Sequence, residues 1–322
     1  MRLLVLGAPR FLGRAIADAA LARGHELTFF NRGRTNPELY PDVERLVGDR
    51  EHDLGALAGR EWDAVIDTSG YLPSVVRASA EALADSGRYC FVSSISVYAD
   101  FSRPMDEDSE VAPIGDDPLD ELTPDFSNYG ALKALCEDTV FETFDVRALV
   151  VRPGLIVGPY DPTGRFTYWP HRLARGGELL APARPDRQTQ FIDVRDLAEW
   201  MVGLCEQDVT GTFNATNQGV TWRELLETCR VVAGVDAEIV WVPDEFLVEQ
   251  GVGEWMELPL WIADPAMSAA DEAVIERALA AGLRFRPLAD TIRATLDEAQ
   301  PTDAAGLSVE READLLAAWH AR

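Results

Sequence analysis

Short apolar runs alternate with longer amphipathic stretches through the first half of the chain. The runs have the length of buried strands, and the stretches repeat apolar residues at the three-to-four spacing of a helix. Strands separated by helices are typical of βαβ units, so we expect a parallel sheet covered by helices on both faces. The pattern predicts strands at 2–6, 25–30, 43–47, 62–67, 88–93 and 146–151, and helices at 11–23, 73–86 and 127–144.

The pattern becomes mixed beyond Pro153. Thr221 and Glu224 have the spacing of a capping box at the start of a helix. Residues 236–287 are rich in aromatic side chains, and we expect them to form much of a smaller lobe. The predicted strands of this half are 188–192 and 211–215, and the predicted helices are 194–206, 221–233 and 308–320.

An acidic segment interrupts the pattern at residues 100–125. It holds ten carboxylates and four prolines, without periodicity. Its length exceeds that of an ordinary connection. Two interpretations stay open, a solvated acidic loop and part of the rim of an active site.

The net charge of the chain limits the classes of partner that it is expected to bind. Its 322 residues include 55 acidic and 29 basic ones, for a formal net charge of −26. Such a charge repels phosphate backbones and anionic lipid surfaces, which argues against nucleic-acid and membrane partners. Lys133 is the single lysine, because the other 28 basic residues are arginines. This bias is typical of a GC-rich or salt-tolerant source.

We recognise no targeting or metal-binding pattern. The chain starts without the basic and apolar regions of a secretion signal, and its apolar runs are far shorter than the ~20 residues of a membrane span. The four cysteines and four histidines are scattered along the sequence. This spacing predicts reduced, mostly buried thiols, no metal site and a cytoplasmic protein.

The first candidate motif is GAPRFLG, residues 7–13, between the first predicted strand and helix. Glycine at such a turn lets the backbone approach a pyrophosphate, which also meets the N–H groups of the helix N-terminus. The usual middle glycine is absent, and an ordinary tight turn is the alternative interpretation. We expect a dinucleotide to contact Gly7, Arg10, Phe11, Leu12 and Gly13.

The end of the second strand bears on the choice of cofactor. A carboxylate there would hold the ribose 2′-hydroxyl of NAD, whereas this chain has Asn31, Arg32 and Arg34. No acid repels a 2′-phosphate, and the arginines can pair with one, so NADP(H) is favoured over NAD(H). Arginines that merely lie on the surface are the alternative. Further cofactor contacts are expected from Asp49 at the adenine edge and from Thr68, Ser69 and Gly70 beneath the ribose and pyrophosphate.

The candidate catalytic motif is Tyr129-Gly-Ala-Leu-Lys133. A spacing of four residues places both side chains on one face of a helix. A nearby ammonium stabilises the phenolate and lowers the tyrosine pKa from its usual value near ~10, which suits acid–base catalysis. A surface lysine on an ordinary helix is the alternative. A serine cluster, residues 93–96, ends a predicted parallel strand and could orient a substrate oxygen.

Together these motifs resemble the extended short-chain dehydrogenase/reductase superfamily, in its NAD(P)-dependent epimerase/dehydratase family. The motifs that carry the resemblance lie within residues 1–235 and are the glycine turn, SSISVY, YGALK, RPGLIVGP and FIDVRDLA. The resemblance implies that Ser94, Tyr129 and Lys133 are catalytic and that Pro153 passes the nicotinamide. It also implies an α/β fold with a doubly wound Rossmann sheet at residues 1–160, with returns at 188–235, and a smaller C-terminal substrate lobe at 161–187 and 236–322.

Some residues depart from the family pattern. The GxxRFLG turn is similar to a branch that contains chloroplast stem-loop RNA-binding proteins. Thr189 and Gln190 stand where epimerases acting on nucleotide sugars carry an arginine. The arginines that could replace it are Arg165, Arg172 and Arg184, and Arg187 is the nearest in sequence.

We therefore expect an NAD(P)-dependent oxidoreductase of the epimerase/dehydratase type, which transfers hydride at a carbonyl or secondary alcohol of a small molecule. The alternatives are a nucleotide-sugar epimerase with bound NAD and a non-catalytic nucleotide- or RNA-binding member of the fold. Ile95 and Ser96 replace the Asp-Glu pair of dehydratases, which disfavours dehydration. The oligomeric state stays open, with the homodimer as the form that family members often adopt.

Overall fold

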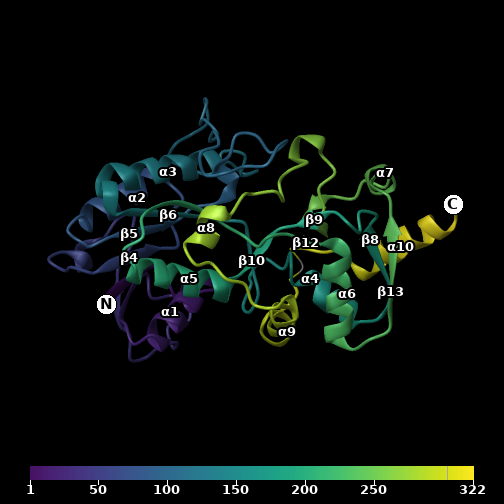
Figure 1. The fold of residues 1–322 in the computed structure, drawn as a ribbon, viewed down its shortest axis with the longest axis horizontal. Coiled ribbons are helices and arrows are strands. Elements are labelled where there is room, and N and C mark those ends of the chain that lie inside the picture. Colours follow the sequence, from purple (N-terminus) through teal and green to yellow (C-terminus); the bar gives the residue numbers. More distant parts are fainter. Residues whose placement is uncertain (303) are drawn as a thin grey trace.

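The computed structural model describes residues 1–302 and 304–322. Figure 1 shows a twisted central sheet between helices, with a second group of elements beside it at the C-terminal end of the chain. The sheet has seven parallel strands in the order β11-β6-β5-β4-β1-β2-β3. Its strands are β1 (Arg2–Leu6), β2 (Glu26–Asn31), β3 (Glu44–Val47), β4 (Ala64–Asp67), β5 (Tyr89–Val92), β6 (Ala148–Pro153) and β11 (Gly211–Ala215). The predicted doubly wound α/β fold is confirmed.

Four helices cover the two faces of this sheet (Figure 1). On one face, α1 (Leu12–Ala22) packs against α5 (Val194–Glu206), and on the other α2 (Pro73–Ala82) packs against α3 (Tyr129–Phe144). Every residue of β4, β5 and β6 is buried as a result. This burial explains why these strands read as continuous apolar runs rather than as an alternating pattern.

A second hydrophobic core lies in the C-terminal part of the chain, around the fully buried Trp169 and Trp261. Its main sheet is a parallel pair, β8 (Gly177–Pro182) with β13 (Ala237–Val242). The chain returns to the first core at Ala278 and Leu283, within the range 236–322 that the sequence assigned to the smaller lobe.

The remaining elements are short or belong to this second part. The strands are β7 (Leu155–Val157), β9 (Gln188–Thr189), β10 (Phe191–Asp193), β12 (Val220–Thr221), β14 (Glu254–Trp255) and β15 (Leu258–Pro259). The α-helices are α4 (Tyr168–Ala174), α6 (Trp222–Ala233), α7 (Asp244–Glu249), α8 (Glu276–Ala280), α9 (Leu288–Glu298) and α10 (Val309–His320). The 3₁₀ turns are η1 (Gly55–Leu57), η2 (Ile95–Val97), η3 (Asp145–Arg147) and η4 (Pro265–Met267).

The elements that the sequence predicts lie within a few residues of their expected bounds, but β8, β13, α4 and α9 had not been predicted. The predicted cap of α6 is present, because Thr221 Oγ1 accepts a hydrogen bond of 3.1 Å from the Glu224 backbone N–H. One predicted strand, 188–192, is two strands in the structure. It is interrupted at Gln190, because β9 pairs with β12 whereas β10 pairs with β7.

The acidic segment 100–125 is only partly a surface loop. Met105 and Glu107 are buried, at 1% and 8% exposure, and Met105 forms a β-bridge with Ala273. The interpretation of a wholly solvated loop is therefore wrong for these residues. No helix among the described residues is long and apolar enough to cross a membrane. All four cysteines are buried and free, as expected.

A buried ion pair joins α3 to the sheet. The Arg152 guanidinium on β6 donates to both carboxylate oxygens of Glu137, with Nε–Oε1 at 2.9 Å and Nη2–Oε2 at 2.6 Å. The third Arg152 nitrogen, Nη1, donates to the Tyr98 hydroxyl at 3.1 Å, and that hydroxyl donates to Asn214 on β11 at 2.6 Å. The helix that carries Tyr129 and Lys133 is thus held against the sheet by polar contacts as well as by its apolar face.

We predict that Glu137→Gln lowers the free energy of unfolding by about 3–5 kcal/mol, because it leaves the Arg152 charge buried without its counter-ion. Urea denaturation followed by circular dichroism measures the change. The matched control is Glu142→Gln on the same helix, since Glu142 is exposed and its ion pair is with the exposed Arg77. Equal effects of the two substitutions would contradict the prediction.

Candidate active site

The predicted site residues gather at one edge of the central sheet. All seven strands are parallel, so their carboxyl ends lie together, and the strand order reverses between β1 and β4. Ligands of open α/β sheets bind outside the carboxyl ends at such a reversal. The glycine turn follows β1, and Thr68, Ser69 and Gly70 follow β4, so the two segments flank this point.

Gly7 is packed against the segment that follows β4. Its φ of +101° suits glycine, and a Cβ atom at this position would lie 2.7 Å from Ser69 Oγ. The turn leads into α1 at Leu12, where Leu12 and Gly13 are buried, Phe11 is half-buried and Arg10 is exposed. The first turn of a helix has N–H groups without intrahelical acceptors, so this arrangement suits an anion.

The three predicted cofactor residues at the end of β2 differ in their surroundings: Asn31 is hydrogen-bonded within the protein, whereas Arg32 and Arg34 are exposed. The Asn31 side-chain amide donates to the Ala8 carbonyl, and its oxygen accepts from the Gly33 backbone N–H at 2.8 Å. Asn31 therefore binds the glycine turn to the loop after β2. Arg32 and Arg34 are exposed, and neither makes an ion pair with any described residue.

Two other predicted cofactor residues have internal partners. Asp49 exchanges backbone hydrogen bonds with Asp53, and its carboxylate accepts from the Glu51 N–H at 3.1 Å. The Thr68 hydroxyl donates to the Leu6 carbonyl at 2.8 Å. Both side chains thus shape the loops at this edge, whatever else they contact.

A buried ion pair that sequence reasoning missed lies beneath the same edge. Arg50 donates to both oxygens of Asp67 at 2.7 Å through Nη1 and Nη2, and the same Nη1 also donates to Ser69 Oγ at 3.1 Å. The Tyr89 hydroxyl donates to Asp67 at 2.7 Å. Burial alone would raise the pKa of Asp67, but the Arg50 charge and these hydrogen bonds hold it below its usual value. The feature of the sequence that could have indicated this ion pair is Asp67 itself, an acid at the end of an otherwise apolar strand.

Tyr129 begins α3, and its position depends on the glycine that follows it. A Cβ atom on Gly130 would lie 1.9 Å from the Ser96 carbonyl oxygen, so any other residue would push the helix away from η2. The turn η2 follows Ser94, whose Oγ accepts from the Ser96 N–H at 3.1 Å and donates to the Ser96 hydroxyl at 3.0 Å. The helix start and the serine cluster are therefore held in close contact.

Lys133 is buried at 3% exposure between strand ends. Its Nζ donates to the Gly70 carbonyl at 2.6 Å and to the Val92 carbonyl at 2.7 Å, and it lies 4.1 Å from the centre of the Phe91 ring. Burial lowers the pKa of Lys133 to about 8. An ammonium has three protons, so one remains for another acceptor.

The pKa of Tyr129 differs from the sequence expectation. Burial raises it to about 12, with a smaller upward contribution from Tyr71, whose ring centre lies 6.4 Å away. Ser94, through a hydrogen bond, and Arg165, through its charge, lower it. Lys133 is not among the main contributors, because its ammonium is turned toward the two carbonyls. Pro153, the last residue of β6, lies at the same edge.

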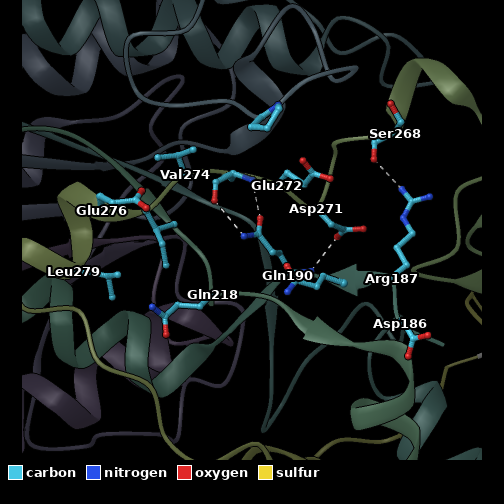
Figure 2. Close-up of a pocket in the computed structure, with 14 residues that line it drawn as sticks. Asp186, Arg187, Gln190, Gln218, Ser268, Asp271, Glu272, Val274, Glu276 and Leu279 are labelled. Atoms are coloured by element: carbon cyan, nitrogen blue, oxygen red, sulfur yellow. Dashed lines mark hydrogen bonds between the residues drawn. The ribbon is translucent and has the colours of Figure 1, made fainter. Parts of the chain in front are cut away.

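A pocket of about 580 Å³ lies between β9 and the segment 268–279 (Figure 2). Its side chains are mainly carboxylates and carboxamides, and none of the predicted site residues lines it. Figure 2 shows Arg187 donating to the Ser268 carbonyl, at 3.2 Å. Gln190, at one of the two positions where the sequence comparison expected an arginine, bonds to the backbone of Ala273 through both ends of its amide. Among the described residues that line the pocket, Arg187 is the one cation that could meet a diphosphate.

The sequence matches the model of the NAD dependent epimerase/dehydratase family over residues 3–216. This match covers the sheet, the glycine turn and the YGALK motif. The chain belongs to this family.

The relatives and solved structures that resemble the chain share little sequence with it. The chloroplast stem-loop binding protein of 41 kDa b from Arabidopsis thaliana is 24% identical over 273 residues, which are 76% of this chain and 67% of that protein. The UDP-glucuronic acid 4-epimerase from Bacillus cereus, solved with NAD, superposes with a TM-score of 0.64 at 17% identity, over 92% of this chain and 98% of the other. The human epimerase family protein SDR39U1, solved with NADPH, gives 0.61 at 20% identity, over 92% and 99%.

The buried lysine of this epimerase/dehydratase family member yields a prediction on stability. Lys133 has a pKa of about 8 in the folded chain and near 10.5 when unfolded, so between these values only the unfolded chain keeps the proton. The free energy of unfolding of the wild type should therefore rise with pH relative to Lys133→Met, by about 3 kcal/mol across this window. Urea denaturation of both proteins at several pH values measures it. A difference that is constant with pH would contradict the assignment.

Proposed function

We propose that the chain transfers hydride between a nicotinamide cofactor and a small molecule with a hydroxyl or carbonyl group, with Tyr129 as the acid–base residue. The observation that supports this most is the joint placement of Tyr129 and Ser94 next to a lysine whose ammonium is fixed at the carboxyl ends of β4 and β5. A lysine on the surface of an ordinary helix would not be buried in this way.

Each residue of the set has a proton to hold or move. In oxidation, the Tyr129 phenolate accepts the proton of the substrate hydroxyl while the carbon loses hydride, and in reduction the phenol returns it to the carbonyl oxygen. The Ser94 hydroxyl, which donates to the Ser96 hydroxyl in the structure, would turn to donate its hydrogen bond to the same substrate oxygen. The remaining Lys133 proton is available to a ribose hydroxyl. The nicotinamide, when bound, accepts or supplies the hydride.

The residues that follow β1, β2 and β4, at the carboxyl ends of these strands, fit a dinucleotide. The glycine turn and the start of α1 suit a pyrophosphate, and Pro153 would pass the nicotinamide. We infer a preference for NADP(H), because Arg10, Arg32 and Arg34 are exposed, lack ion pairs among the described residues and stand out in a chain of net charge −26. Contacts to the adenosine half of the cofactor would come from Asp49, Thr68, Ser69 and Gly70.

An RNA-binding role is the second candidate, because the Arabidopsis relative is described as a stem-loop binding protein. The net charge of the chain opposes it, since phosphate backbones are repelled. Titration of a labelled RNA stem-loop at moderate salt separates the two. Tight binding there, without turnover of any carbonyl substrate, would favour the second candidate.

We predict that Tyr129→Phe reduces turnover by a factor of ~10²–10⁴ and leaves cofactor affinity unchanged, because only the proton-transfer group is lost. A carbonyl and sugar substrate panel, followed by cofactor absorbance, measures turnover. Tyr71→Phe is the matched control, since this tyrosine lies beside Tyr129 and is 47% exposed. Full turnover by the Tyr129 variant would overturn the assignment.

We also predict that Arg34→Ala weakens NADPH binding about ten-fold, or about 1.4 kcal/mol, and leaves NADH binding unchanged, because only NADPH carries the 2′-phosphate. Fluorescence titration of both cofactors measures it. Arg2→Ala serves as control, since Arg2 is an exposed arginine at the opposite end of β1. Equal affinity of the wild type for the two cofactors would refute the NADP(H) preference.

A further inference from the structure

The guanidinium of Arg50 is held through all three of its nitrogens beneath the proposed cofactor site. Nη1 and Nη2 donate to the two oxygens of Asp67 at 2.7 Å, and Nε donates to Ser79 Oγ on α2 at 3.1 Å. Asp67 is fully buried and also accepts a hydrogen bond of 2.7 Å from the Tyr89 hydroxyl. Because each contact fixes a different nitrogen, the plane of the guanidinium has one direction.

The same ion pair holds Ser69 at two points. Each terminal nitrogen of a guanidinium carries two protons, so Arg50 Nη1 can donate to Asp67 and also to Ser69 Oγ, 3.1 Å away. The backbone N–H of Ser69 donates to Asp67 Oδ1 at 3.0 Å. The carboxylate therefore fixes the backbone of Ser69, and the guanidinium fixes its side chain.

The hydrogen bond from Arg50 determines the role of the Ser69 hydroxyl. A hydroxyl has one proton to donate, and a donor that already occupies a lone pair of its oxygen directs this proton elsewhere. No described residue accepts the Ser69 proton. The neighbouring Thr68 differs, because its hydroxyl proton is donated to the Leu6 carbonyl at 2.8 Å. Ser69 is therefore a half-buried hydroxyl whose proton is left for another acceptor.

Ser69 Oγ lies against the glycine turn. A Cβ atom on Gly7 would be 2.7 Å from it, and the turn leads into the first N–H groups of α1, which suit a pyrophosphate. The Asp67 carboxylate balances the charge of Arg50, so Arg50 itself attracts an anion at this edge only weakly. Its main effect on an anion is expected to pass through the hydroxyl of Ser69.

We propose that Arg50 and Asp67 are positioning residues for the cofactor, because they present the Ser69 hydroxyl as a hydrogen-bond donor to an oxygen of its pyrophosphate. The inference rests on the proposed function, since it requires a nicotinamide dinucleotide at the sheet edge. It concerns the pyrophosphate, which NAD(H) and NADP(H) share, so it does not depend on the preference between them. Binding tests it without turnover.

The test is a fluorescence titration of the full chain with NADPH and with NADH. Ser69→Ala should weaken binding about ten-fold, because a hydrogen bond to a charged oxygen is lost. The neutral pair, Arg50→Met combined with Asp67→Asn, should weaken it to a similar extent and leaves no unpaired charge inside the protein. Adding Ser69→Ala to the neutral pair should change the affinity by less than about two-fold, because Arg50 acts through the lost hydroxyl.

Circular dichroism shows whether each variant is folded. Arg50→Lys is the milder variant if the neutral pair does not fold, because one ammonium cannot reproduce the planar fork that reaches both Asp67 and Ser69. Its loss of affinity should be smaller than that of the neutral pair, and it should likewise disappear once Ser69→Ala is present.

The matched control for lost stability is Glu312→Gln. Glu312 forms a buried ion pair with Arg172, and it lies on α10, which packs into the second hydrophobic core. This variant should unfold at lower urea concentration than the wild type and bind the cofactor as tightly. An equal loss of cofactor affinity in this control would overturn the role of Arg50, since instability alone would then explain the effect.

The remaining outcomes separate this role from the proposed function. Wild-type affinity in Ser69→Ala or in the neutral pair would overturn the role of Arg50, and so would losses that multiply when the two are combined. Full turnover by Tyr129→Phe would overturn the proposed function alone. A wild type that binds neither cofactor would overturn both.

Discussion

The ammonium of Lys133 joins three elements on which the site depends. Its two hydrogen bonds, to Gly70 after β4 and to Val92 at the end of β5, connect adjacent strand ends to α3. Both hydrogen bonds require the Lys133 side chain to be buried between the strand ends. The same burial lowers the pKa of Lys133 to about 8. A compact ammonium fits between two carbonyls, whereas a planar guanidinium needs a wider space. The single lysine of an arginine-rich chain therefore lies where an arginine would not fit.

The same edge is stabilised from below by an arginine. Arg50 and Asp67 form a bidentate pair beneath Ser69, and Ser69 in turn packs against Gly7. Buried ion pairs add little net stability, but they specify one arrangement, because an alternative packing would leave a charge without its partner. The glycine turn and the loop after β4 are thus held at a fixed separation.

The sequence was sufficient for the sheet and for the motifs of the first half, because buried parallel strands and amphipathic helices have strong periodic patterns. It was insufficient where the partner of a side chain comes from a distant segment. Contacts between remote residues determine three features of the structure. These are the pairing of Arg50 with Asp67, the burial of Glu107 and the position of Arg165 beside Trp255. The contacts of the Lys133 ammonium are of the same kind, since the two carbonyls that hold it lie 63 and 41 residues away.

The large negative charge of the chain gives its local cations their selectivity. A small anion approaching a protein of net charge −26 is repelled over most of the surface. It gains energy only where a cation lacks an acidic neighbour, and most arginines of this chain are paired with carboxylates. The exposed arginines after β1 and β2, Arg10, Arg32 and Arg34, stand apart from that pattern, because none of them makes an ion pair with a described residue. An anionic group of the cofactor, held by these arginines, would then position the cofactor along the sheet edge that carries Tyr129.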